Sequence, residues 1–210
     1  RINVAIQSRA EIQALRARIR PHFLFNSLNT IASLTRSNPE QAEAAVENLA
    51  DLFRISLRDN QKPHTLKEEC NLCQRYIEIE ALRLGDRLTV DWQIHDLPDD
   101  ALLPPLTLQP LLENAIYHGI EPLANGGTIL IKGELTKNKL RQKQISIVIS
   151  NPLLASHRQH GNQMALDNIQ QRLQSFYNNK AHIQIENTNG LFTLSLIFPY
   201  ITRYEDPDRR

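Results

Sequence analysis

The stretch RPHFLFNSLN, residues 20–29, places polar side chains at helical spacing among apolar ones. His22, Asn26 and Asn29, followed by Ser33, are separated by four, three and four residues, so they form one stripe of a helix. The stripe is apolar in the two preceding turns and becomes polar at His22. This pattern predicts a helix that ends near Ser37 and carries an imidazole and two amides along its seam.

A second amphipathic helix follows directly. Asn38 and Pro39 are typical of a helix start, with asparagine as the N-cap and proline at the first helical position. Two amphipathic helices cannot bury both apolar faces alone, so we expect a homodimer built on a four-helix bundle. An interior proline at Pro21 predicts a bend in the first helix. The expected apolar face of the second helix is Ala42, Ala45, Val46, Leu49, Leu52, Phe53 and Ser56.

The rest of the chain reads as an α+β layer, with helices on one face of a mostly antiparallel sheet. Thr65 and Glu68 form a capping box that starts a third helix, which reaches Leu84. We therefore expect a helical hairpin over 1–62, an α/β sandwich over 63–202 and a disordered tail over 203–210. The strands expected from period-two alternation are 88–95, 128–135, 144–150, 181–187 and 191–198, and the helices expected between them are 106–120 and 163–177.

Composition excludes several classes of function. The formal net charge of the 210 residues is +1, which gives no field to attract nucleic acid, and no apolar run is long enough for a transmembrane span. The chain begins at Arg1, so we expect a piece of a longer protein whose missing N-terminal region holds a membrane anchor. Cys70 and Cys73 lie on an apolar helical stripe, which favours packing over a zinc or redox site.

His22 is the first candidate for chemistry. A lone seam histidine is more often a structural residue, but this one follows a proline and has Asn26 one turn later. An imidazole with an ordinary pKa of about 6.5 is a usable nucleophile near neutral pH. Asn26 would either orient the ring or hold a water beside it.

The second candidate is LLENAIYHG, residues 111–119, where Glu113, Asn114 and His118 occupy adjoining positions of one helix. An amide oxygen is a hard ligand that suits Mg²⁺ bound to phosphates, and the neighbouring carboxylate can accept a proton. A solvated helix end explains the same residues equally well on spacing alone.

Three blocks together resemble the LytS-type sensor histidine kinases, and more closely their alginate-regulating branch: RPHFLFNSLN (20–29), LCQRYIEIEALRLGDRL (72–88) and PPLTLQPLLENAIYHG (104–119). The blocks stand in the family's order, and the resemblance covers nearly the whole chain. It implies a dimerising hairpin that carries a phosphoacceptor histidine, followed by a GHKL-type ATP-binding domain.

The resemblance also implies roles for single residues. His22 resembles the phosphorylated histidine, Asn114 the Mg²⁺-binding asparagine, and Glu113 the carboxylate before it, while His118 would line the same pocket. Asn151, in VISNP (148–152), stands where the family usually has an aspartate that binds the adenine amino group. Residues 160–173 fall on the family's glycine-rich lid, whose matching positions here are Gly161, Leu166, Asn168, Arg172 and Leu173, while Gln163 and Ala165 replace glycines.

The implied function is a kinase that uses Mg²⁺ and ATP to phosphorylate His22 and then transfers the phosphoryl group to an aspartate of a response regulator. It would work at the cytoplasmic side of the bacterial inner membrane. The altered lid and Asn151 keep an alternative open, in which a degenerate kinase acts as a dimeric regulator-binding scaffold or phosphatase with weak ATP turnover.

Overall fold

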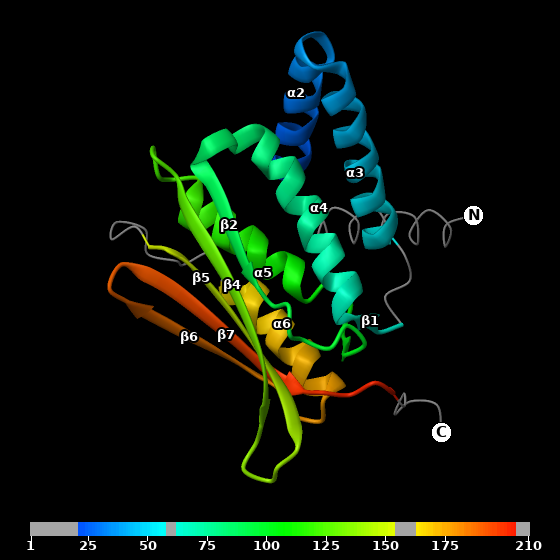
Figure 1. Cartoon of the computed structure of the whole chain (residues 1–210), viewed down its shortest axis with the longest axis vertical. Helices are drawn as coiled ribbons and strands as arrows, with labels where there is room; N and C mark the ends of the chain where they lie inside the picture. The colour runs from blue at the N-terminus through cyan, green and yellow to red at the C-terminus, as the bar shows by residue number, and fades with distance from the viewer. Residues whose placement is uncertain (1–20, 58–61, 154–162, 205–210) are drawn as a thin grey trace, which may run out of the picture. The chain divides into compact units, whose positions relative to one another are not determined.

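The computed structural model describes residues 21–57, 62–153 and 163–204 (Figure 1). Its helices are α2 (Pro21–Ser37), α3 (Pro39–Leu57), α4 (Leu66–Leu84), α5 (Leu108–Ala115) and α6 (Gln163–Phe176), with a 3-10 turn η1 (Gly85–Arg87) and a π-turn η2 (Ile116–Ile120). Its strands are β1 (His64–Thr65), β2 (Leu88–Gln93), β3 (Leu102–Leu103), β4 (Gly127–Lys137), β5 (Lys143–Pro152), β6 (His182–Thr188) and β7 (Leu191–Pro199).

These elements form two compact units. The hairpin unit contains the described residues 21–57 and 74–83, and the sheet unit contains 62–73 and 84–204. Helix α4 therefore takes part in both units, a division that the single boundary expected at residue 62 does not include. The bend expected at Pro21 and the apolar turns before it involve residues outside the described part of the chain.

In the hairpin unit, the expected start of the second helix is confirmed. The backbone N–H of Gln41 donates to Oδ1 of Asn38 over 3.2 Å, which is the N-cap bond. The face of α3 is buried at most of the expected positions, but Val46 is 50% exposed within one chain, so its burial by a second copy stays a prediction. The buried members of the face are Ala42, Ala45, Leu49, Leu52 and Ser56, and Phe53 is half-buried.

The C-terminal half of α4 contacts both helices of the hairpin. The ring of Tyr76 lies 4.8 Å from that of Phe23, centroid to centroid. Asn48 of α3 donates to Glu78 over 2.8 Å, so the contact also has a polar part. Because α4 already covers part of the hairpin, the need for a second copy is smaller than the sequence argument assumes.

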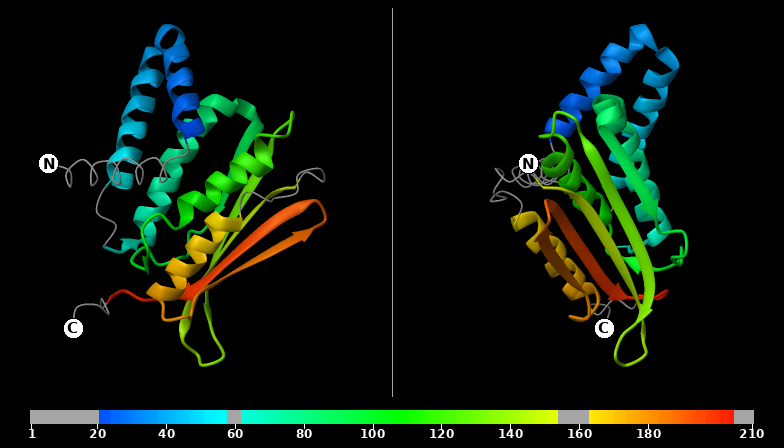
Figure 2. Two further views of the ribbon diagram at one scale, coloured as in Figure 1. Left: turned by 180° about the vertical axis from the view of Figure 1, so that it is seen from behind. Right: turned by 60° about the vertical axis from the view of Figure 1, so that its left-hand side comes forward.

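In the sheet unit, β2, β4, β5, β7 and β6 form one sheet in that order, parallel at β2–β4 and antiparallel elsewhere. Helices α5 and α6 lie on the same face of this sheet (Figures 1 and 2). Alternation places one face of each central strand in the core. The buried residues of β5 and β7 are Ile145, Ile147, Ile149, Asn151, Phe192, Leu194, Leu196 and Phe198. The predicted α+β class is confirmed.

Three local features of the sheet unit differ from expectation. The helix expected over 106–120 is α5 followed by the π-turn η2, and β1 pairs with β3 in a two-residue ladder that alternation did not reveal. Tyr204, in the tail expected to be disordered, stacks on Phe176 with ring centroids 4.2 Å apart. Residues 205–210 lie outside the described chain.

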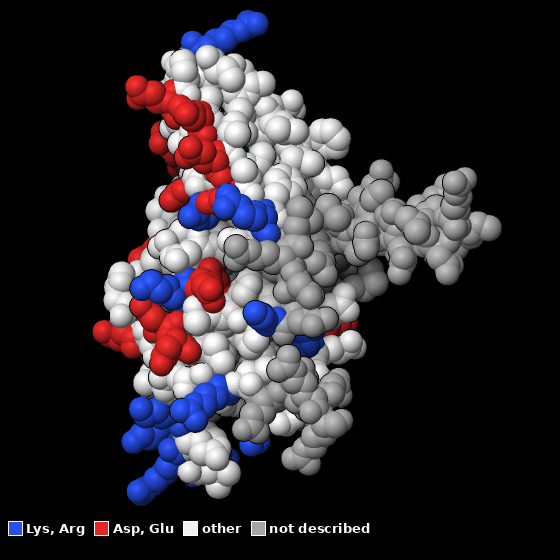
Figure 3. All heavy atoms as spheres, turned by 90° about the vertical axis from the view of Figure 1, so that its right-hand side faces the viewer, with Lys and Arg blue, Asp and Glu red and all other residues white. Residues whose placement is uncertain are grey.

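On the face drawn in Figure 3, acidic side chains gather in one area and basic side chains in another, while elsewhere the two signs are mixed. On α3 the exposed acids Glu40, Glu43 and Glu47 recur at helical spacing. The turn between β4 and β5 exposes four bases, Lys137, Lys139, Arg141 and Lys143. Among the described helices, none is both long and apolar enough to cross a membrane.

Candidate functional site

His22 lies near the start of the described part of α2, and its side chain is exposed. The amide nitrogen of Asn26 is 3.2 Å from Nδ1 and 3.3 Å from Nε2 of the ring, so Asn26 contacts the imidazole as expected. The residues of α2 that are buried are Phe23, Ser27 and Ile31, on another face of the helix. The polar stripe is therefore a surface feature of this chain, and the imidazole is accessible.

Asn114 lies near the end of α5 and is 2% exposed. Its Oδ1 atom has no hydrogen-bond partner among the described residues. A buried acceptor without a partner costs about 1–3 kcal/mol, so Oδ1 of Asn114 is available to bind a ligand or an ordered water. The solvated-helix-end alternative is wrong for Asn114, because the side chain is not in solvent.

Two neighbours extend this polar group along α5. Gln109 donates through Nε2 to Oε1 of Glu113 over 2.8 Å. The side-chain oxygen of Gln109, Oε1, is also buried and has no hydrogen-bond partner in the described chain. Glu113 is half-buried. The α5 face thus carries a carboxylate and unpaired amide oxygens, the hard donor atoms that Mg²⁺ takes.

Asn151 is the last buried residue of β5 and is 2% exposed. Its Nδ2 donates to the carbonyl oxygen of Pro152 over 2.8 Å, and its Oδ1 has no partner among the described residues. Gly119 of η2 packs directly against this amide, since a β-carbon there would lie 2.2 Å from Nδ2. The close approach brings the end of the α5–η2 segment to the end of β5.

The other polar residues of η2 lie nearer the surface. His118 is half-buried and Tyr117 is 45% exposed. Their rings meet edge to face with centroids 4.8 Å apart.

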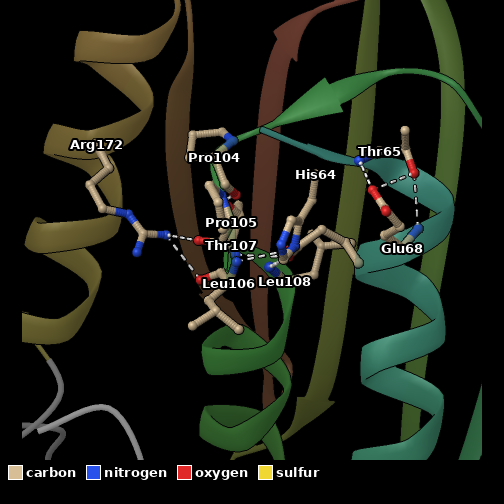
Figure 4. Close-up of polar contacts among 10 residues, drawn as sticks. His64, Thr65, Glu68, Pro104, Pro105, Leu106, Thr107, Leu108 and Arg172 are labelled. Atoms are coloured by element: carbon tan, nitrogen blue, oxygen red, sulfur yellow. Dashed lines mark hydrogen bonds and ion pairs between the residues drawn. The ribbon is translucent and has the colours of Figure 1, made fainter. Parts of the chain in front are cut away.

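Arg172 of α6 is exposed, but its guanidinium also binds the backbone of a distant loop. Its Nη2 atom donates to the carbonyl oxygens of Pro105 and Leu106 over 2.9 and 3.0 Å (Figure 4). Arg172 therefore ties α6 to the loop that precedes α5, a structural contact that the resemblance did not suggest.

Glu69 is a residue that sequence reasoning missed. It lies in the first turn of α4, is completely buried, and accepts hydrogen bonds from a loop more than 35 residues later. Oε1 accepts from the N–H of Leu106 over 2.7 Å, and Oε2 accepts from the N–H groups of Thr107 and Leu108 over 2.8 and 2.9 Å. Nδ1 of His64 lies 2.8 Å from Oε1.

The loop that Glu69 holds has an unfavourable backbone. Leu106 has φ of 56°, a left-handed conformation that costs a residue with a β-carbon about 1–2 kcal/mol. Thr107 stands at the N-cap of α5, but its hydroxyl donates to the carbonyl oxygen of Pro104 over 2.6 Å and does not cap the helix. The Glu69 carboxylate occupies the place of that cap.

Comparison with known proteins decides the family. A family model described as histidine kinase matches residues 10–88. The sensor histidine kinase YpdA of Escherichia coli (strain K12) is 36% identical over 190 residues, which is 84% of this chain and 32% of the relative. The sensor histidine kinase/phosphatase LytS of Staphylococcus aureus (strain Mu50) is 30% identical over 209 residues, 94% of this chain and 35% of the relative.

This chain belongs to the LytS-type sensor histidine kinase family. It spans about a third of the length of these relatives. Among solved structures, the Acinetobacter baumannii histidine kinase AdeS is 17% identical with a TM-score of 0.49, over 92% of this chain and 97% of that one. The resemblance to the alginate-regulating branch stays a prediction.

The lid expected from the LytS-type pattern is only partly described. Leu166 is buried in α6 and Asn168 is exposed. Gly161, and the side chains of Gln163 and Ala165, lie outside what the structure describes, so the roles of these residues stay predictions.

The two thiols are packing groups in the described structure. Burial, with a smaller contribution from Glu69, raises the pKa of Cys70 to about 12 and also raises the pKa of Cys73 well above its ordinary value. Burial and then Glu69 also raise the pKa of Tyr177, whose hydroxyl donates to the carbonyl oxygen of Leu102 over 2.6 Å. Over the described residues, no group of three or more His, Cys, Asp or Glu side chains could hold a metal ion.

Proposed function

We propose that this chain binds ATP with Mg²⁺ in the sheet unit and transfers the γ-phosphoryl group to His22. The observation that carries the proposal is that the buried side-chain oxygens of Asn114 and Asn151, like that of Gln109 beside Glu113, have no partner among the described residues. Asn114 and Asn151 stand at the two positions that the LytS-type pattern gives to the metal and to adenine. Unpaired buried acceptors are rare in folded proteins, and two on neighbouring elements favour a ligand with donor groups and a cation.

The residues present fit such a ligand. Asn114 would hold Mg²⁺ through its Oδ1, and Glu113 would accept a proton or order a water beside it. Mg²⁺ bound there would neutralise charge on the phosphates during transfer. Asn151 would accept a hydrogen bond from the adenine amino group, and His118 would line the same pocket.

His22 would act as the nucleophile. An exposed imidazole beside the Asn26 amide can present a ring nitrogen to a phosphorus atom. Asn26 would hold the ring in one orientation, which lowers the entropy cost of reaching the reactive geometry.

The partners follow from the same proposal. The phosphoryl group would pass to an aspartate of a response regulator. The chain would act as a homodimer, joined through the hairpin unit, where the large apolar side chains Phe25, Leu28 and Val46 are 66%, 48% and 50% exposed. A region outside this sequence would anchor the protein at the cytoplasmic side of the inner membrane.

The test is incubation of the purified chain with Mg²⁺ and ATP labelled at the γ-phosphate. Label should appear on the wild-type protein and be stable in base but labile in acid, as phosphohistidine is. His22→Gln should remove the label, while His182→Gln, which changes an exposed histidine of β6, should keep it. Undiminished label on His22→Gln would refute the assignment.

A second candidate function is that of a phosphatase or a regulator-binding scaffold with weak ATP turnover. It is favoured by the relative LytS, whose name includes phosphatase, and by Gln163 and Ala165 in place of lid glycines. The same labelling experiment separates the two, because a scaffold would dimerise and bind the regulator but acquire no label.

A further inference from the structure

Loop 104–108, which leads into α5, is held from two sides by side chains of distant elements (Figure 4). Arg172 binds two of its carbonyl oxygens, and Glu69 binds three of its N–H groups. We propose that Glu69 is a positioning residue for nucleotide binding, which holds the start of α5 so that Asn114 is presented to the metal. The inference rests on the proposed function and deepens it.

The first step is that Glu69 is the cap of α5. The first N–H groups of a helix have no partner within the helix, and an anion near them is stabilised by the helix dipole. The natural N-cap, Thr107, uses its hydroxyl elsewhere. Glu69 takes the role of the N-cap acceptor instead, because its two carboxylate oxygens accept hydrogen bonds from the N–H groups of Leu106, Thr107 and Leu108.

The second step is that a carboxylate is required. Glu69 is completely buried, so water does not replace any bond that it loses. Its oxygens face four donors, counting Nδ1 of His64 when that nitrogen carries the proton. A glutamine in its place keeps one acceptor oxygen and turns an NH₂ group toward N–H donors, so at least one N–H of the loop loses its partner.

The third step connects the cap to Asn114. Helix α5 has only eight residues, and Asn114 is six residues after Leu108, a rise of about 9 Å. The capped turn is therefore about half of α5. If the N-terminal end of α5 tilts, Asn114 at the other end is displaced as well. Displacement of a ligand by about 1 Å can cost a hundredfold in function, so loss of the cap should be visible in affinity.

The experiment compares wild type, Glu69→Gln and a matched control. Glu80→Gln changes a second buried glutamate of the same helix, 4% exposed, which accepts from Arg83 and Tyr76 of α4. Hydrogen exchange without nucleotide measures the amides of 106–108, and calorimetry measures Mg²⁺·ATP affinity. Glu69→Gln should speed exchange at these amides and weaken Mg²⁺·ATP by about tenfold or more, and Glu80→Gln should do neither.

Glu69→Asp is the conservative variant. It restores the charge at shorter reach, so it should recover part of both effects, which a purely packing role would not produce. Protected amides in Glu69→Gln, or wild-type affinity despite fast exchange, would overturn the inference. So would an equal loss of affinity in Glu80→Gln, since the loss would then follow general stability.

Failure of the proposed function gives a different result. Absence of Mg²⁺·ATP binding to the wild-type chain would refute that function and the nucleotide role of Glu69 with it. Binding to the wild type with unchanged affinity in Glu69→Gln would refute the positioning role alone.

Discussion

Replacing Asn151 by aspartate should weaken the fold before it strengthens ATP binding. The Nδ2 atom of Asn151 donates to the carbonyl oxygen of Pro152 over 2.8 Å. Aspartate has no such donor, and its carboxylate would place an oxygen against that carbonyl in a site that is 2% exposed. Loss of a buried hydrogen bond with an acceptor left unpaired costs about 1–3 kcal/mol, and this is the expected fall in the free energy of unfolding without nucleotide.

The effect of pH on Asn151→Asp has a definite sign. Burial raises the pKa of the introduced carboxyl above its unfolded value of about 3.9, because the charged form is desolvated. The protonated form can donate to Pro152 and restore the bond. The destabilisation should therefore be absent below the unfolded pKa and should grow as the pH rises through the folded pKa. Urea unfolding from about pH 4 to about pH 8 measures this difference against wild type.

Nucleotide should reverse the loss. The adenine amino group would donate to the new carboxylate, and a charged acceptor binds more strongly than a neutral one. We expect Mg²⁺·ATP to bind about tenfold more tightly to Asn151→Asp, which corresponds to about 1.4 kcal/mol. Asn187→Asp, at an exposed position of β6, is the control and should change neither quantity. Unchanged stability at neutral pH, or weaker ATP binding, would refute the placement of Asn151 against adenine.

Two further predictions test the metal ligand and the dimer. Asn114→Ala should abolish the Mg²⁺-dependent part of the ATP affinity measured by calorimetry, whereas Asn114→Asp should retain some of it because aspartate keeps a hard oxygen. Equal affinity of the wild type for ATP in Mg²⁺ and in EDTA would contradict the assignment. Val46→Asp should shift sedimentation toward the monomer with little change in the unfolding temperature, because the Val46 side chain is half exposed. Ala44→Asp, on another face of α3, is the control and should leave the dimer intact. A wild-type protein that sediments as a monomer at micromolar concentration would refute dimerisation.

The features that the sequence predicts correctly are those set by local chemistry. The capping box is present, because the Thr65 N–H donates to Glu68 over 2.7 Å and the Glu68 N–H donates to the Thr65 hydroxyl over 3.2 Å. Period-two alternation identifies the five strands of the main sheet, and in β4, β5 and β7 alternate residues are buried. The Asn38 cap of α3 is also predictable from local sequence, because its hydrogen-bond partner Gln41 is only three residues away.

The features that it misses depend on distant partners. The backbone N–H partners of Glu69 begin 37 residues later, and no spacing rule connects a glutamate in one helix with the N–H groups of another. Val46 is 50% exposed within one chain, and the α3 stripe alone does not specify what covers it. The left-handed Leu106 gives no signal, because leucine has no preference for that conformation.

The π-turn at Ile116–Ile120 makes the length of this segment critical. The N–H of Glu121 donates to the carbonyl oxygen of Ile116 over 2.9 Å, so the turn contains one residue more than an α-helical turn. Deletion of a single residue between Asn114 and Gly119 would allow an ordinary α-helical turn, but it would shift Gly119 from its place against Asn151. A residue with a side chain would then face Asn151, where Gly119 leaves no space for a β-carbon. Substitutions in this turn should therefore be tolerated more often than deletions, and natural variants should keep its residue count.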